Sequence, residues 1–97
     1  MKNELKYFDW NDDKNEILKR ERNISFEEVV TAIQSGGLLN RLKHPNSQKY
    51  PNQYIFYVKI NNYVYSVPFV EEENRTFLKT IYPDRVATKK YLGDYYD

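Results

Sequence analysis

The sequence predicts an α+β fold: a small, mostly antiparallel sheet of four to five strands, two N-terminal helices packed on it and a short C-terminal helix. Residues 53–70 hold two runs of β-branched and aromatic residues around Asn61-Asn62, which is typical of a hairpin. Residues 25–37 combine a helix start signal, an apolar stripe and two glycines. The chain has 97 residues and no linker-like segment, so we expect residues 1–97 to form one domain.

The first elements are predicted by their end signals. Residues 5–10 read Leu-Lys-Tyr-Phe-Asp-Trp and favour a short strand at an edge of the sheet. Asn11 is a candidate N-cap for a helix that runs to about Arg22, with acidic side chains near its positive end. This helix offers only Ile17 and Leu18 to a core, so we expect it to lie on the surface.

The second helix has the stronger start signal. Residues 25–28 read Ser-Phe-Glu-Glu and form a capping box, with Ile24 and Val29 placed as a hydrophobic staple. Its apolar residues recur at helical spacing: Phe26, Val29, Val30 and Ile33. Gly36 and Gly37 end the helix, residues 38–43 predict a strand, and residues 44–52 predict a loop because they contain two prolines.

The hairpin follows from a two-residue turn at Asn61-Asn62. Ile60 then lies opposite Tyr63, and the pairing continues outward to Tyr54 and Phe69. One face carries only apolar or aromatic side chains: Tyr54, Phe56, Val58, Ile60, Tyr63, Tyr65, Val67 and Phe69. The other face is mixed and suits solvent or a ligand: Ile55, Tyr57, Lys59, Val64, Ser66 and Pro68. Pro68 cannot donate to a ladder, so we expect a bulge there or a ladder that has ended.

The C-terminal part contains one more strand and one more helix. Residues 71–74 form an acidic turn, and residues 75–82 predict a strand that Pro83 stops. Asp84 is a candidate cap for a helix over residues 85–92, which Gly93 ends. We expect residues 94–97 to be frayed.

Composition excludes several classes of site. The chain has no cysteine and one histidine, which rules out a thiolate zinc site and a multi-histidine metal site, and we predict no cofactor. No apolar run approaches ~18 residues, so we expect a cytoplasmic protein that does not contact the membrane. The formal charge of +1 argues against a protein that coats nucleic acid by bulk charge, although a local basic patch remains compatible with it.

The C-terminal part concentrates basic and aromatic side chains. Between Arg75 and Leu92 there are five basic residues and one acidic residue, together with Tyr82 and Tyr91. The basic residues are Arg75, Lys79, Arg85, Lys89 and Lys90. Cations at such a strand–helix junction suit a phosphodiester, whose reaction develops negative charge. A solvated helix end, in which cations complement the helix dipole, is the alternative interpretation.

The loop over residues 44–52 holds a second set. His44 is the residue whose unperturbed pKa lies near neutrality, which suits acid or base chemistry in RNA cleavage. Lys49 and Tyr50 suit contacts with a phosphate and a base. A structural or solvated role for each of these side chains stays open.

Three segments carry short motifs: residues 8–15, 24–28 and 85–90. Phe8 to Asn15 reads Phe-Asp-Trp-Asn-Asp-Asp-Lys-Asn and resembles the F-x-W-D/N-x-x-K-N opening of the BrnT family of bacterial toxins, and residues 24–28 resemble the start of that family's second helix. Residues 85–90 resemble its R-x-A-S/T-K/R-K/R ending. These matches stand in the family's order and frame nearly the whole chain.

The resemblance implies a RelE-like fold and the toxin of a type II toxin–antitoxin pair. Such a toxin is a metal-independent endoribonuclease that cleaves mRNA, in some cases on the ribosome, through attack by the RNA 2′-OH. An antitoxin encoded nearby inhibits it, and operator DNA is bound only through that antitoxin. The resemblance points first to Arg85, and then to Lys79 and Lys89 as cations that face the phosphate, whereas the loop with His44, Lys49 and Tyr50 is not part of the family pattern. From the resemblance and the residue chemistry together we predict catalytic roles for Arg85, Lys79, His44 and Tyr91, and RNA-binding roles for Lys49, Tyr50, Lys59, Tyr57, Lys89 and Lys90.

Two other functions stay open. The first is a toxin of the same fold that is not a nuclease and binds another target, such as a topoisomerase. The second is a non-toxic binding module that uses the sheet face of Tyr57, Lys59 and Ser66.

Overall fold

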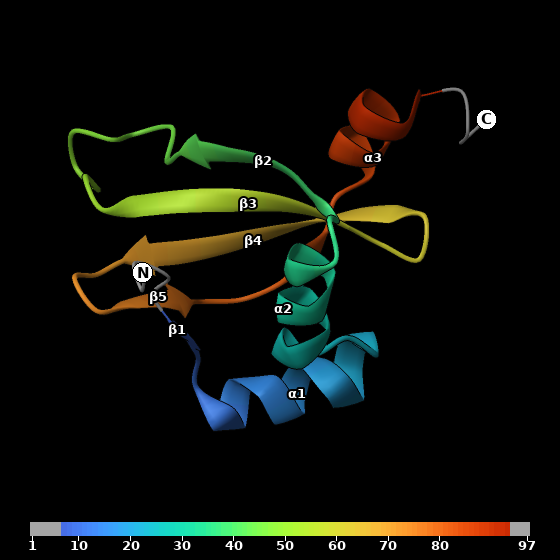
Figure 1. The fold of residues 1–97 in the computed structure, drawn as a ribbon, viewed down its shortest axis with the longest axis horizontal. Coiled ribbons are helices and arrows are strands. Elements are labelled where there is room, and N and C mark those ends of the chain that lie inside the picture. The colour runs from blue at the N-terminus through green and yellow to red at the C-terminus, as the bar shows by residue number, and fades with distance from the viewer. Residues whose placement is uncertain (1–6, 94–97) are drawn as a thin grey trace.

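The computed structural model describes residues 7–93, which form three helices and a mixed sheet of six strands (Figure 1). The elements are β1 (Tyr7–Asp9), α1 (Asp12–Arg22), α2 (Phe26–Gln34), β2 (Leu38–Lys43), β3 (Gln53–Ile60), β4 (Tyr63–Glu71), β5 (Arg75–Leu78), β6 (Tyr82–Pro83) and α3 (Arg85–Leu92). The α+β class is confirmed. Predictions for residues 5–6 and for the tail 94–97 fall outside the described residues.

The strands lie in the order β1-β5-β4-β3-β2, and β6 pairs with β4 beyond the end of β5. β1 runs parallel to β5, whereas the other pairs are antiparallel. The sheet is therefore mixed and has more strands than the four to five predicted. The three helices gather around one end of the long strands, and the other end, with the loop over residues 44–52, extends past them (Figure 1).

The hairpin of β3 and β4 has the predicted register. Ile60 lies opposite Tyr63, and the pairing runs without a shift to Gln53 opposite Val70. Asn61 and Asn62 have φ angles of 54° and 64°, the left-handed values that a tight two-residue turn requires. Asparagine tolerates these angles better than most residues, which explains why the chain turns here.

The predicted strand over residues 75–82 is wrong in one respect, because it is broken into β5 and β6. Leu78 lies opposite Phe69 and Tyr82 opposite Ser66, so the three residues 79–81 lie opposite only two residues of β4, 67–68. The extra residue bulges out opposite the stretch that contains Pro68. The Pro68 carbonyl accepts a hydrogen bond from the Lys79 amide at 2.8 Å, but proline has no N–H with which to donate a second bond to this strand.

Both N-terminal helices start at the predicted caps. The Asn11 side chain accepts from the Lys14 amide, and the Ser25 side chain accepts from the Glu28 amide. α1 is not wholly a surface helix: Leu18 is 1% exposed and Asn15 is 3% exposed. Asn15 accepts from the Phe26 amide and donates to Glu27, so a polar side chain joins α1 to the start of α2.

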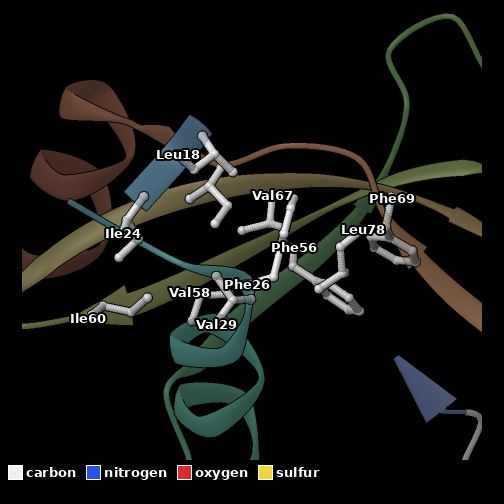
Figure 2. Close-up of a cluster of buried hydrophobic side chains, with 11 residues drawn as sticks. Leu18, Ile24, Phe26, Val29, Phe56, Val58, Ile60, Val67, Phe69 and Leu78 are labelled. Carbon is white, nitrogen blue, oxygen red and sulfur yellow. The ribbon is translucent and has the colours of Figure 1, made fainter. Parts of the chain in front are cut away.

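The main core lies between these helices and the hairpin face that was predicted to be apolar (Figure 2). Its buried members are Leu18, Ile24, Phe26, Val29, Phe56, Val58, Ile60, Val67, Phe69, Leu78 and Ile81. We call this side of the sheet the helical face. Among residues 7–93, no helix is long and apolar enough to cross a membrane.

The opposite side, which we call the α3 face, is only partly open. α3 covers the turn end of β4, where Val64 is fully buried and its amide donates to the Thr88 hydroxyl at 2.9 Å. The predicted cap of α3 is confirmed, since the Asp84 carboxylate accepts from the Ala87 amide at 2.8 Å. The rest of this face stays half-buried at Ile55, Ser66 and Pro68.

Candidate functional site

The candidate site is a pocket of about 210 Å³ where α3 meets β2 and β3 on the α3 face. Its lining residues are Leu42, Tyr57, Asp84, Val86, Ala87, Lys90 and Tyr91. Tyr57, Lys90 and Tyr91 belong to the site predicted from sequence. Leu42 and Asp84 do not, although Asp84 had been identified as a helix cap.

Two tyrosines form the wall of this pocket. The rings of Tyr57 and Tyr91 lie 5.7 Å apart, centre to centre, and tilt by 39°. Tyr57 comes from the middle of β3 and Tyr91 from the last turn of α3. The pocket therefore depends on how α3 docks on the sheet, which the hydrogen bond between Thr88 and Val64 fixes.

The phenol of Tyr91 is held in place by a side chain that the sequence analysis did not identify. Asn40 on β2 donates from Nδ2 to the Tyr91 hydroxyl at 2.8 Å. Since the phenol oxygen accepts this bond, its own proton is available for another acceptor. The two residues are 51 positions apart in the chain, and no short motif indicates such a pair.

Charge in the pocket comes from one cation and one anion. The Lys90 ammonium lies 5.5 Å from the centre of the Tyr91 ring. Asp84 uses Oδ1 for the cap, and a carboxylate has a second oxygen that can accept a proton or a hydrogen bond. Burial, followed by the charge of Asp84 and the presence of Tyr91, raises the pKa of Tyr57 above its usual value. Tyr57 is therefore a hydrogen-bond donor at neutral pH rather than a base.

The other predicted cations of this part of the chain do not line the pocket. Arg85, Lys79 and Lys89 are exposed. A turn of about 100° per residue puts Arg85 and Lys89 on a side of α3 away from the pocket-lining Val86 and Lys90. Lys59 is exposed two residues beyond Tyr57, on the same face of β3.

The loop over residues 44–52 forms a separate cluster. The rings of His44 and Tyr50 lie 4.6 Å apart, and the Lys49 ammonium lies 5.5 Å from the Tyr50 ring. The His44 amide donates to Gln53, so the cluster sits at the end of β2 and β3 that is far from the hairpin turn. His44 is four residues beyond Asn40, roughly 13 Å along the strand, and is not brought to Tyr91.

The hydrogen bond of His44 defines its tautomer. The Asn46 amide donates to Nδ1 at 3.0 Å, so Nδ1 is the acceptor and the proton of neutral His44 is on Nε2. In this state the ring offers a donor to its surroundings. To act as a general base, the ring would have to take a proton on Nδ1, and Nδ1 already accepts the hydrogen bond from the Asn46 amide.

Comparison of the chain with protein-family models, curated proteins and solved structures found no match. Among residues 7–93, no three side chains of His, Asp or Glu gather where they could bind a metal ion.

Proposed function

We propose that the chain is a metal-independent endoribonuclease of the toxin type, with its reacting groups in the pocket of Tyr57, Lys90 and Tyr91. The observation that carries the proposal is the Tyr91 phenol, which Asn40 orients at 2.8 Å beside a second tyrosine and a lysine. The resemblance to BrnT toxins supports the same proposal. Tyrosines and lysine are side chains that can act on a phosphodiester without a metal ion.

The reaction is a transesterification within RNA. The 2′-oxygen forms a bond to the adjacent phosphorus as the bond to the 5′-oxygen breaks. A base takes the 2′ proton, an acid protonates the leaving 5′-oxygen, and cations stabilise the negative charge on phosphorus. The products are a 2′,3′-cyclic phosphate and a 5′-hydroxyl.

The pocket offers a group for each role. Asp84 has a carboxylate oxygen that can take the 2′ proton, and the Tyr91 phenol has a proton to give. Tyr57, whose pKa is raised, stays protonated and can donate to a phosphate oxygen. Lys90 supplies the charge in the pocket, and Lys59 is a further exposed cation on the same face of β3.

The test is cleavage of a labelled single-stranded RNA by the purified chain in the presence of EDTA, with and without ribosomes. Tyr91→Phe and Lys90→Gln should each lower the cleavage rate by about 100-fold, because each removes a group that acts on the reacting phosphate. Lys19→Gln on α1 removes the same charge on the other side of the molecule and should leave the rate unchanged. Activity that EDTA abolishes, or that all of Tyr57→Phe, Lys90→Gln and Tyr91→Phe leave intact, would contradict the proposal.

A specific observation also favours a protein partner at this site. Val86 is 80% exposed and Leu42 is 43% exposed, and both border the pocket. An antitoxin encoded nearby would bury them and cover the reacting groups.

A non-catalytic binding module is the second candidate function. Harmless expression of the chain, combined with intact RNA in the cleavage assay, would favour it.

A further inference from the structure

β2 forms one edge of the sheet, because the strand order ends with it (Figure 1). Residues 41–43 of this strand are exposed, and no strand within residues 7–93 pairs with its outer side. β2 has six residues, which is long enough to pair with a further strand. An exposed edge strand presents unpaired backbone groups, which proteins either protect or use to bind another chain.

The hydrogen-bond pattern identifies the backbone groups that face outward. In an antiparallel pair, successive residues alternate between pointing at the partner strand and pointing away from it. The His44 amide donates to the Gln53 carbonyl at 2.9 Å, so His44 points at β3. The alternation continues without a shift back to Asn40. The amides and carbonyls of Arg41 and Lys43 therefore point away from the sheet.

One of these outward groups is occupied and the others are open. The Arg41 amide donates to Oδ1 of the Asn40 side chain at 2.8 Å. Within residues 7–93, the Lys43 amide and the carbonyls of Arg41 and Lys43 have no hydrogen-bond partner. Open donors and acceptors at alternate residues complement an extended polypeptide, which carries the same groups. A phosphate backbone offers acceptors alone and does not complement the carbonyls.

The charge around this edge is positive. Between Glu28 and Glu71 the chain has no acidic residue and four basic ones: Arg41, Lys43, Lys49 and Lys59. Lys43 is exposed and, in the described part of the chain, forms no ion pair. The Arg41 side chain contacts Glu71 at 3.5 Å and is still 46% exposed. Cations on an edge strand oppose pairing with a second copy of the same edge, whereas they attract an acidic segment.

The two faces of the edge define the side chains that such a segment would carry. Arg41 lies on the helical face, where its guanidinium is 4.1 Å from the centre of the Tyr54 ring, and Lys43 shares that face. Leu42 lies on the α3 face and, like Val86, lines the pocket there and is exposed. Because side chains of a strand alternate between faces, the fitting segment has acidic residues at every second position and apolar residues between them.

We propose that the outer edge of β2 binds an extended acidic segment of a partner protein, which adds a strand to the sheet. A carbonyl of the segment would accept from the Lys43 amide, and an amide of the segment would donate to the Lys43 carbonyl. Carboxylates of the segment would pair with Lys43 and Arg41. This docking does not depend on the proposed ribonuclease activity.

The same docking would affect the proposed RNA site through Asn40. The added strand needs the Arg41 amide, which now donates to Asn40 Oδ1. Nδ2 of the same side chain donates to the Tyr91 phenol at 2.8 Å. A carbonyl of the segment that replaces Oδ1 frees the Asn40 side chain to turn, so Tyr91 loses the donor that orients it. The bound segment should therefore slow RNA cleavage, and this step alone rests on the proposed function.

The experiment titrates the full chain with a fluorescein-labelled peptide of about ten residues in which glutamate alternates with valine, and it measures fluorescence anisotropy. We expect a Kd on the order of 100 µM at low salt and weaker binding as salt screens the charges. A peptide with glutamine in place of glutamate should bind at least about tenfold more weakly, because it lacks the carboxylates.

Four variants test the assignment of residues. Lys43→Pro removes the outward amide and keeps the ladder to β3, because proline is tolerated on an edge strand, and it should abolish peptide binding. Lys43→Gln removes the charge alone and should weaken binding about threefold. Asn40→Ala removes the acceptor that competes for the Arg41 amide and should strengthen binding a few-fold. Lys59→Gln is the control, since it removes the same charge from β3 and should leave binding unchanged.

Circular dichroism checks that each variant is folded. If Lys43→Pro does not fold, Lys43→Glu tests the same edge, because it replaces attraction by repulsion and should weaken binding by at least about tenfold. In the absence of peptide, Lys43→Pro should leave RNA cleavage unchanged. A chain that cleaves RNA but does not bind the peptide would contradict only the docking site, and a chain that binds the peptide but leaves RNA intact would contradict only the proposed function.

Three results would overturn the proposal. The first is the absence of peptide binding by the unchanged chain at low salt. The second is an equal loss of binding in Lys43→Gln, Lys43→Pro and Lys59→Gln, which would reduce the interaction to general charge attraction. The third is binding of a labelled single-stranded RNA that Lys43→Pro weakens, without binding of the peptide, which would assign this edge to RNA.

Discussion

Gly37 is the one of the three glycines that has no room for a side chain. A Cβ atom there would lie 2.8 Å from the Lys59 carbonyl oxygen and 2.9 Å from that of Ala32. The Gly37 amide donates to Ala32 at 2.7 Å, and its carbonyl accepts from the Lys59 amide at 2.8 Å. Gly37 therefore joins the end of α2 to β3 through its backbone.

Gly37→Ala should lower the free energy of unfolding by about 1–3 kcal/mol, because both contacts are with backbone that cannot move aside. Gly36→Ala is the matched comparison. Gly36 has a φ of +95° but open space around it, so its substitution should cost only about 1 kcal/mol of backbone strain. Urea unfolding of the two variants measures both values. A Gly37 variant as stable as the unchanged chain would show that α2 and β3 can separate at no cost.

Asp9 provides a pH dependence at the edge of the sheet. Its side chain contacts Arg75 at 2.6 Å, and this hydrogen bond is the main reason why the pKa of Asp9 is lower than that of an ordinary aspartate. A carboxyl whose pKa is lowered by folding contributes stability above its unfolded pKa and loses it as the pH falls through the folded value. The pairing of β1 with β5 should therefore weaken below about pH 4.

We expect Asp9→Asn to flatten the acid side of the stability–pH curve and to lower stability at neutral pH. Unfolding measured by fluorescence between pH 2 and 7 tests this, given that ordinary carboxyls titrate near pH 4. Glu73→Gln, in the neighbouring exposed turn, is the control and should leave the curve unchanged. Equal acid sensitivity in Asp9→Asn and the unchanged chain would rule out the pair as its source.

The role of a single residue can be predicted from the sequence when its partners are close to it in the chain. Asn11, Ser25 and Asp84 cap helices that begin within three residues of them. Asn40 is different: its Oδ1 accepts from the Arg41 amide and its Nδ2 donates to Tyr91. That role depends on the docking of α3, which no local pattern contains.

Among the elements, α3 is attached by a network that centres on one hydroxyl. Thr88 is fully buried, accepts from the Val64 amide at 2.9 Å and donates to the Asp84 carbonyl at 2.8 Å. Thr80, in the bulge between β5 and β6, presents the opposite case. Its hydroxyl is buried and, within the described chain, has no hydrogen-bond partner.

The same substitution should therefore have opposite effects at the two positions. Thr80→Val should raise the free energy of unfolding by about 1 kcal/mol, because it removes an unsatisfied polar atom and keeps the shape. Thr88→Val should lower it by about 1–3 kcal/mol, because it leaves the Val64 amide without its acceptor. Urea unfolding of both variants is the measurement. Destabilisation by Thr80→Val would indicate that the hydroxyl has a partner after all.

Elements formed by interactions between residues close in sequence could be predicted, whereas features that depend on distant residues could not. The register of the hairpin is determined by its own turn at Asn61 and Asn62, so it could be read from the sequence. The break between β5 and β6 lies opposite the stretch of β4 that contains Pro68. In the sequence, Pro68 predicts a bulge but does not indicate which of the two strands carries it. The parallel pairing of β1 with β5 joins residues 68 positions apart and has no local signature.

In the whole molecule, six of the ten predicted functional residues lie in two separate clusters. Tyr57, Lys90 and Tyr91 meet at the pocket, whereas His44, Lys49 and Tyr50 gather at the far end of β2 and β3. In sequence, both clusters suit RNA equally well. The distance along β2 separates their roles, since His44 lies roughly 13 Å along the strand from Asn40, the residue that holds the Tyr91 phenol.

The separation predicts different kinetic effects for the two clusters. If the proposed activity is correct, Lys49→Gln and Tyr50→Ala should raise KM for RNA about five- to tenfold with little change in kcat, because they remove binding that does not change in the transition state. Lys90→Gln and Tyr91→Phe should lower kcat at saturating RNA. Combining one variant from each cluster should multiply the effects, since the clusters share no contact. His44→Gln decides between the assignments: a fall in kcat as large as that of Tyr91→Phe would move the reacting centre to the loop, whereas a change confined to KM would leave it at α3.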